Sequence, residues 1–67
     1  MRWQHPDGRI IETYLNRDGV WTAGWRADGK WRRFTTPWLR HYWTEIAAEA
    51  ELAYYAEAKK WRRNGEG

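Results

Sequence analysis

The chain has 67 residues, of which 42% are hydrophobic and 31% charged, and its net charge is +3 at pH 7. This length limits it to one domain, and the composition excludes intrinsic disorder. Cysteine is absent, which excludes disulfides and thiolate metal sites, and no run of about 18 apolar residues could span a membrane. Because the N-terminus lacks an apolar signal core, we expect a cytoplasmic protein.

Aromatic side chains are abundant for so short a chain, with seven Trp, four Tyr and one Phe. Each can bury a large apolar area, so a small core can offset the loss of chain entropy on folding. We therefore expect a single folded domain over residues 1–67.

Asp-Gly, a dipeptide suited to hairpin turns, occurs three times in the first half of the chain. The copies are Asp7-Gly8, Asp18-Gly19 and Asp28-Gly29, and their spacing matches strands joined by short turns. Pro6 confines the first strand to an edge of the sheet. The expected antiparallel strands are residues 3–5, 9–15, 20–26 and 30–35.

The second half of the chain favours one helix. Thr36 is a suitable N-cap and Pro37 a suitable first helical residue, and neither Gly nor Pro recurs before Gly65. We expect a helix over residues 37–63, ended by Asn64-Gly65, and a frayed tail over residues 64–67. The predicted fold is α+β: a small antiparallel β-meander of three to four strands (residues 3–35) packed against one long C-terminal α-helix.

The turn at Asp28-Gly29 fixes which strand residues share a face. If the turn has two residues, Ala27 pairs with Lys30 and Trp25 faces Arg32. A three-residue loop at 17–19 would align the preceding strand. One face then carries Ile11, Thr13, Leu15, Trp21, Ala23, Trp25 and Phe34. The other face carries Ile10, Glu12, Tyr14, Thr22, Gly24, Arg26, Trp31, Arg33 and Thr35.

The second of these faces mixes arginines, threonines and one tryptophan. An exposed aromatic side chain among cations is typical of a nucleic-acid contact, by stacking or beside the backbone. The alternative is that Trp31 only covers the stems of Arg26 and Arg33 and closes one end of the sheet through cation–π contact.

Residues 20–35, VWTAGWRADGKWRRFT, resemble the three-stranded AP2-like DNA-binding domains, including the arm-binding domains of phage-type tyrosine recombinases. In that class the sheet lies in the major groove and a helix packs behind it. The resemblance implies a DNA partner, contacted by Thr22, Arg26, Trp31, Arg33 and Thr35. Here, however, the helix opens Pro37-Trp38-Leu39, where that class usually has a Lys/Glu-Ala pattern.

A helix over residues 37–63 would be longer than the sheet that it covers. Its first half offers a core stripe, formed by Leu39, Tyr42, Trp43, Ile46, Ala47 and Ala50. Its second half would overhang, and exposed contiguous apolar surface marks an interaction site. We expect a protein partner or a homodimer to cover Tyr54, Tyr55, Ala58 and Trp61. The alternative is that Trp3 and the first strand fold under this half.

The residue types needed for catalysis or metal binding are poorly represented. His5 and His41 have no ligand-spaced partner, and the chain contains no serine. The run from Lys59 to Arg63 is explained as a favourable helix end, with phosphate contact as the alternative. We therefore expect a DNA-binding module that is not an enzyme and uses no cofactor or metal. The alternative is a protein-interaction module, a phage-type inhibitor or adaptor, that uses the helix.

Overall fold

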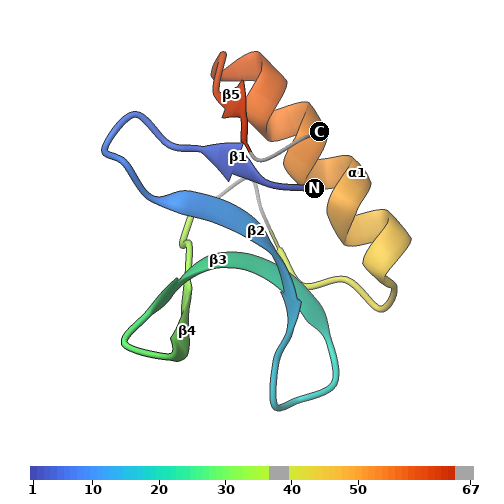
Figure 1. Cartoon of the computed structure of the whole chain (residues 1–67). Helices are drawn as coiled ribbons and strands as arrows, with labels where there is room; N and C mark the ends of the chain where they lie inside the picture. The colour runs from blue at the N-terminus through green and yellow to red at the C-terminus, as the bar shows by residue number, and fades with distance from the viewer. Residues whose placement is uncertain (37–39, 65–67) are drawn as a thin grey trace.

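A computed structural model describes residues 1–36 and 40–64 and shows an α+β fold, as predicted (Figure 1). The strands form one antiparallel sheet in the order β4-β3-β2-β1-β5, and a single helix packs against it. No helix among the described residues is long and apolar enough to cross a membrane. The elements are β1 (Trp3–Gln4), β2 (Ile10–Leu15), β3 (Trp21–Ala27), β4 (Lys30–Arg33), α1 (Glu45–Ala58) and β5 (Arg62–Arg63).

The hairpins have the predicted registers. Strands β3 and β4 pair Ala27 with Lys30 and Trp25 with Arg32, across a turn in which Asp28 and Gly29 have φ values of 54° and 75°. Both central residues of this turn lie in the left-handed region, which Gly occupies readily and Asp tolerates. Strands β2 and β3 pair Leu15 with Trp21, and the Asn16 N–H donates to the Val20 carbonyl at 2.9 Å, which leaves a three-residue loop at 17–19. The predicted division of the sheet into two faces is therefore confirmed.

Strand β1 does not lie at an edge of the sheet, contrary to the prediction. It pairs with β2 on one side and with β5 on the other, where Trp3 is opposite Arg63. Pro6 is compatible with this position because it lies in the turn after the strand. The prediction failed because residues 62–63 were assigned to a helix, so no partner strand was available.

Helix α1 is shorter than predicted at both ends. Pro37, Trp38 and Leu39 lie outside the described residues, and residues 40–44 are not helical. Tyr42 instead forms an isolated antiparallel bridge with Trp21. The N-cap is Thr44, whose hydroxyl accepts a hydrogen bond from the Ala47 N–H at 3.1 Å. A second Thr with the same capping chemistry thus begins the helix eight residues beyond Thr36.

The helix ends at Ala58 in a Schellman motif, well before Asn64. Lys60 adopts a left-handed φ of 62°, and its N–H donates to the Glu57 carbonyl. The Trp61 N–H donates to the Ala56 carbonyl at 2.8 Å. The Trp61 ring then contacts Tyr55 at 5.3 Å between centroids, which is the apolar contact that usually accompanies this motif.

The core lies between α1 and one face of the sheet. It comprises Trp3, Ile11, Ala23, Phe34, Leu52, Tyr55, Ala56 and Trp61. Phe34, Tyr55 and Trp61 meet edge to face, with ring centroids 5.3 to 6.1 Å apart. Trp3 is 2% exposed, so the predicted alternative, in which the first strand packs under the second half of the helix, is the arrangement observed.

The predicted core stripe of the helix is wrong. Ile46 and Trp43 are each 83% exposed and Ala50 is also exposed, whereas Ala48, Leu52, Tyr55 and Ala56 are buried. Residues 40–44 and 59–63 are not in the helix, so the described part of the chain has no overhanging helical half. The sheet therefore meets the face centred on Leu52, and Trp43, Ile46 and Ala50 of the predicted stripe are exposed.

Candidate nucleic-acid interface

The open face of the sheet, on the side opposite α1, is centred on two stacked aromatic rings. Tyr14 and Trp31 lie with centroids 4.6 Å apart and planes 4° from parallel. Arg26 is paired with Trp31 across β3 and β4, and its guanidinium lies 5.4 Å from the Trp31 ring centroid. A cation and two rings are thus held together at the surface.

Gly24 makes this stack possible. A Cβ at this position would lie 2.0 Å from the Arg32 carbonyl oxygen and 2.8 Å from Cε1 of Tyr14. Because Gly24 has no side chain, Tyr14 of β2 can extend across β3 to reach Trp31 of β4. Gly24 therefore allows neighbouring groups to approach the strand closely, which is a common role of glycine inside strands.

The structure brings together three of the five residues predicted to contact DNA. Arg26, Trp31 and Arg33 lie on the open face, and the two arginines are exposed. Thr22 belongs to the same face but is only 2% exposed, because it lies directly opposite Tyr14 and next to the crowded Gly24. Thr35 is exposed, two residues beyond the end of β4.

Tyr14 is also an electrostatic neighbour of Arg33. Burial raises the pKa of the Tyr14 hydroxyl above 10.0, and the positive charge of Arg33 opposes this shift. The sequence placed Tyr14 on this face but gave no sign that its ring stacks on Trp31. That contact depends on how far the side chain reaches across Gly24.

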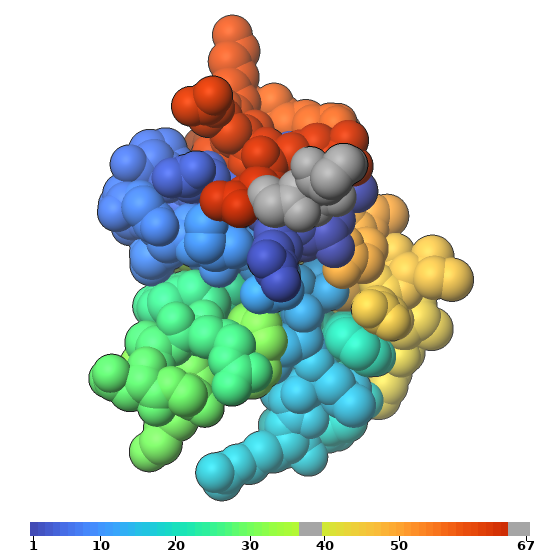
Figure 2. Space-filling view, viewed as in Figure 1, coloured from blue at the N-terminus to red at the C-terminus, as the bar shows by residue number. Residues whose placement is uncertain are grey.

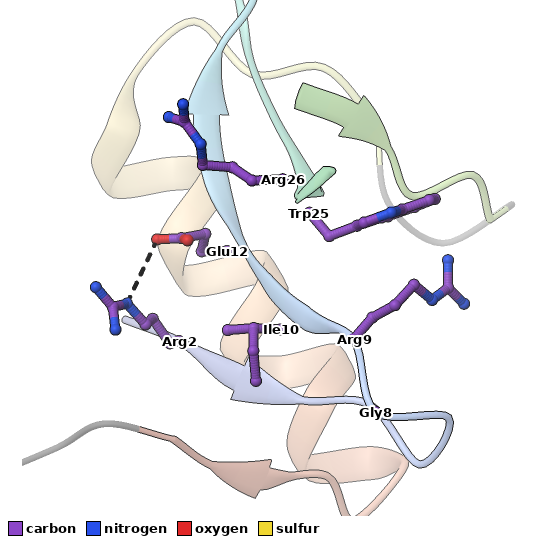
Figure 3. Close-up of a pocket in the computed structure, with 7 residues that line it drawn as sticks. All are labelled: Arg2, Gly8, Arg9, Ile10, Glu12, Trp25 and Arg26. Carbon is purple, nitrogen blue, oxygen red and sulfur yellow. Dashed lines mark ion pairs between the residues drawn. The ribbon is translucent and has the colours of Figure 1, made fainter. Parts of the chain in front are cut away.

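Beyond this array the sheet opens into a groove, which the sequence did not predict. The β2–β3 ladder ends at the pair Glu12–Gly24, after which β3 pairs with β4 alone and β2 with β1. A groove of about 390 Å³ lies between them (Figure 3). Its lining residues are Arg2, Gly8, Arg9, Ile10, Glu12, Trp25 and Arg26.

Three arginines and one glutamate face this groove, and Asp7 pairs with Arg9, so the net charge around it is slightly positive. Arg2 and Glu12 form an ion pair at 3.8 Å on one side, opposite Arg9 and Trp25 (Figure 3). The Arg9 guanidinium lies 4.3 Å from the Trp25 ring centroid. Such planar guanidinium groups suit phosphate oxygens.

Arg9 is positioned by the turn before β2. Its Nε and Nη2 both lie 2.7 Å from Oδ2 of Asp7, and its backbone N–H donates to Oδ1 at 3.0 Å. The side-chain hydrogen bond from Arg9, followed by its backbone hydrogen bond, lowers the pKa of Asp7 to about 2. Asp7 is thus charged at neutral pH and fixes the direction of Arg9.

A second hollow separates the tips of the two hairpins, which project as distinct green and cyan lobes in Figure 2. It measures about 440 Å³ and borders the outer edge of the Tyr14–Trp31 stack. Arg17 and Lys30 line it from the two sides, together with Leu15 and Asn16. Basic side chains therefore continue from the groove, past the stacked rings, to the hairpin tips.

Helix α1, behind the sheet, carries four of the nine acidic side chains. Helix α1 carries four Glu and no basic residue, whereas the remainder of the chain has twelve basic and five acidic side chains. Glu49 is directed inward, where it accepts hydrogen bonds from the Thr13 hydroxyl and the Met1 amine. Glu45, Glu51 and Glu57 are exposed. The modest net charge is therefore the sum of an acidic helix and a remainder of the chain that is basic.

Of the four residues predicted to bind a protein partner, two are buried in the core and two are exposed. Tyr55 and Trp61 are each 9% exposed and pack against Phe34, whereas Tyr54 and Ala58 are exposed. Trp61 was predicted on the surface because the helix was extended through it. In the structure the Schellman motif turns it inward.

No protein-family model, curated protein sequence or solved structure matches this chain. Within the described part of the chain, no group of three or more His, Asp or Glu side chains could hold a metal ion.

Proposed function

We propose that this chain is a small nucleic-acid-binding module that holds duplex DNA against the open face of its sheet. The observation that carries the proposal is the array of Arg26 and Arg33 around the stacked rings of Tyr14 and Trp31. The arginines would contact the phosphate backbone and the edges of bases, as arginines on DNA-binding sheets do.

The separation of charge supports the same conclusion. Phosphates would meet Arg2, Arg9 and Arg26 along the groove, while the exposed glutamates of α1 lie behind the sheet. A basic surface that is continuous over one face supplies most of the affinity for a polyanion. The segregation also gives the approach a direction, because a duplex is attracted to one side of the molecule only.

The stacked rings favour a duplex over a single strand. Proteins that bind single strands offer free aromatic faces to unpaired bases. Here Tyr14 already covers one face of Trp31, and the Arg26 guanidinium contacts the same ring. The rings then serve to position the arginines for contacts with the phosphate backbone and the grooves of the DNA duplex.

The proposal is tested by fluorescence anisotropy with a labelled duplex over a series of salt concentrations. The wild-type affinity should fall steeply with salt, and each of Arg26→Ala and Arg33→Ala should reduce that logarithmic slope by about 0.9. The same oligonucleotide as a single strand should bind more weakly than the duplex.

Arg32→Ala is the matched control. Arg32 lies between Trp31 and Arg33 in the same strand and is also exposed, but it pairs with Trp25 on the opposite face. It should retain the wild-type slope. Binding that is independent of salt, or equal losses in all three variants, would show that the open face is not the site. If the protein prefers the single strand, the proposed contact with the duplex backbone is wrong and stacking on unpaired bases takes its place.

A further inference from the structure

The face of α1 that points away from the sheet carries an unpartnered apolar stripe. Ile46, Ala50 and Tyr54 recur every four residues of the helix, which places them opposite the buried Leu52. Trp43 and Ile46 are each 83% exposed and Tyr54 is 66% exposed. We give the name outer stripe to Ile46, Ala50 and Tyr54 of α1 together with Trp43, which lies just before the N-cap. So much exposed apolar surface on one small helix marks an interface.

The charges around the outer stripe exclude the ligand proposed for the sheet. Glu45, Glu51 and Glu57 are exposed on the same helix, and α1 has no basic residue. A polyanion would be repelled from this side. The occupant is therefore a protein surface with apolar side chains of matching spacing.

The outer stripe is complementary to a second copy of itself. Ile46 precedes Ala50 by four residues and Tyr54 follows it by four. In an antiparallel pair that crosses at Ala50, Ile46 of each copy would meet Tyr54 of the other, as a two-fold axis requires. Ala47 and Ala53 flank the crossing, and such small side chains allow the helix axes to approach to about 8 Å.

Electrostatics favour the antiparallel direction. Trp43 precedes Ala50 by seven residues and Glu57 follows it by seven. Each Glu57 would therefore lie beside the N-terminal turn of the other helix, where the helix dipole is positive and attracts a carboxylate. In a parallel pair all four glutamates of one helix would align with those of the other, whereas the antiparallel pair brings only Glu49 and Glu51 to the same level.

We propose that two copies of the chain pair through the outer stripe as an antiparallel homodimer. Because α1 lies between its sheet and the dimer axis, the two open faces would point in opposite directions. One dimer could then bridge two separate DNA segments. The bridging rests on the function proposed above, whereas the dimer does not.

Sedimentation velocity from about 1 μM to about 500 μM tests the dimer. The wild type should change from monomer to dimer over this range. Ile46→Glu and Tyr54→Glu should each weaken association at least tenfold, because each places a carboxylate against an apolar partner. Both residues are exposed in the monomer, so both variants should fold, as far-UV circular dichroism would verify.

Leu15→Glu is the matched control, since Leu15 is 54% exposed but lies on β2. It should leave the dimer unchanged. A wild type that stays monomeric throughout, or a dimer that persists in both stripe variants, would overturn the proposal. In either case the exposed stripe would serve a different partner or none.

The absence of cysteine allows a direct test of the crossing point. Ala50→Cys should be linked to its own second copy by a short bis-maleimide. Ala58→Cys should not, because the two cysteines would lie about 24 Å apart along the helices. Linkage at position 58 and not at position 50 would contradict the antiparallel crossing.

Bridging is measured by capture of a labelled duplex on beads that carry an unlabelled one. The wild type should capture it, and Ile46→Glu should bind DNA without capture. If no variant binds DNA, the proposed function is wrong while sedimentation still decides the dimer. If the dimer forms and binds DNA without capture, the opposed arrangement of the faces is wrong.

Discussion

The open face of the sheet and the outer face of α1 both carry aromatic side chains, but hold them in opposite ways. On the sheet, Tyr14 and Trp31 stack on each other beside Arg26, and both rings are half-buried. Beside and on the helix, Trp43 and Tyr54 are largely exposed, and α1 itself carries four glutamates and no basic residue. A set of fixed cations suits a polar ligand, whereas bare apolar surface suits a protein.

The two surfaces share no residue, and the core separates them. They should therefore respond independently to changes on the surface and together to changes in the core. Three substitutions test this comparison, and their expected effects on stability decrease in the order given.

Trp61→Ala should disrupt the open face of the sheet and the outer stripe of the helix together. Trp61 joins α1 to Phe34 and His5, with ring centroids 5.4 and 4.9 Å away. Its loss should lower the free energy of unfolding by about 3–5 kcal/mol. A domain of this size has a stability of only about 3–10 kcal/mol, so much of the chain should unfold.

Urea denaturation followed by circular dichroism measures the effect. Trp43→Ala is the control, because it removes the same side chain from a position that is 83% exposed. It should shift the midpoint little. Similar midpoints for the two variants would mean that Trp61 does not anchor the core.

Gly24→Ala should disturb the packing of the open face and leave the structure of helix α1 unchanged. The added methyl would have to displace the Arg32 backbone and the Tyr14 ring, at a cost of about 1–3 kcal/mol. Near-UV circular dichroism should show the loss of the Tyr14–Trp31 stack. The helical far-UV signal provides the internal reference, and an unchanged near-UV spectrum would contradict the role given to Gly24.

Lys60→Gly should stabilise the fold without altering either surface. Lys60 has a φ of 62°, which is unfavourable for any residue with a Cβ and costs Gly nothing. The greater freedom of Gly in the unfolded chain offsets part of this stabilisation, so the free energy of unfolding should rise by about 0.5–1 kcal/mol. This corresponds to a rise in Tm of about 2–8 °C for so small a domain.

Lys59→Gly provides the contrast, because Lys59 has a right-handed φ of −88°. It should lower Tm, since Gly gains nothing there and loses conformational freedom on folding. Two variants that change Tm in the same direction would exclude the left-handed strain as the cause.

The sheet could be predicted from the sequence because its determinants are local. Asp28-Gly29 fixes the β3–β4 turn, and the three-residue loop at 17–19 fixes the alignment of β2, so alternation alone assigned the faces. That assignment placed Arg26, Trp31 and Arg33 together. It could not show that Thr22 is buried, because this depends on Tyr14 and on the space left by Gly24.

The helix ends could not be predicted because they depend on tertiary contacts. Thr36 and Thr44 are equivalent caps by composition, and the bridge to Trp21 holds Tyr42 outside the helix. At the other end, Lys60 takes a left-handed conformation that its own type disfavours. Burial of Trp61 against Tyr55 compensates for it. The arginine groove was missed because it arises where two strand pairs diverge.

The pairing of β1 with β5 has a consequence for the order in which the chain folds. Hairpins β1–β2, β2–β3 and β3–β4 join residues close in sequence, but the β1–β5 pair joins Trp3 to Arg63. Closing so long a loop is entropically demanding, so the hairpins should form first and β5 should add last. During synthesis, the core around Trp3 can therefore be completed only after residues 61–63 have left the ribosome.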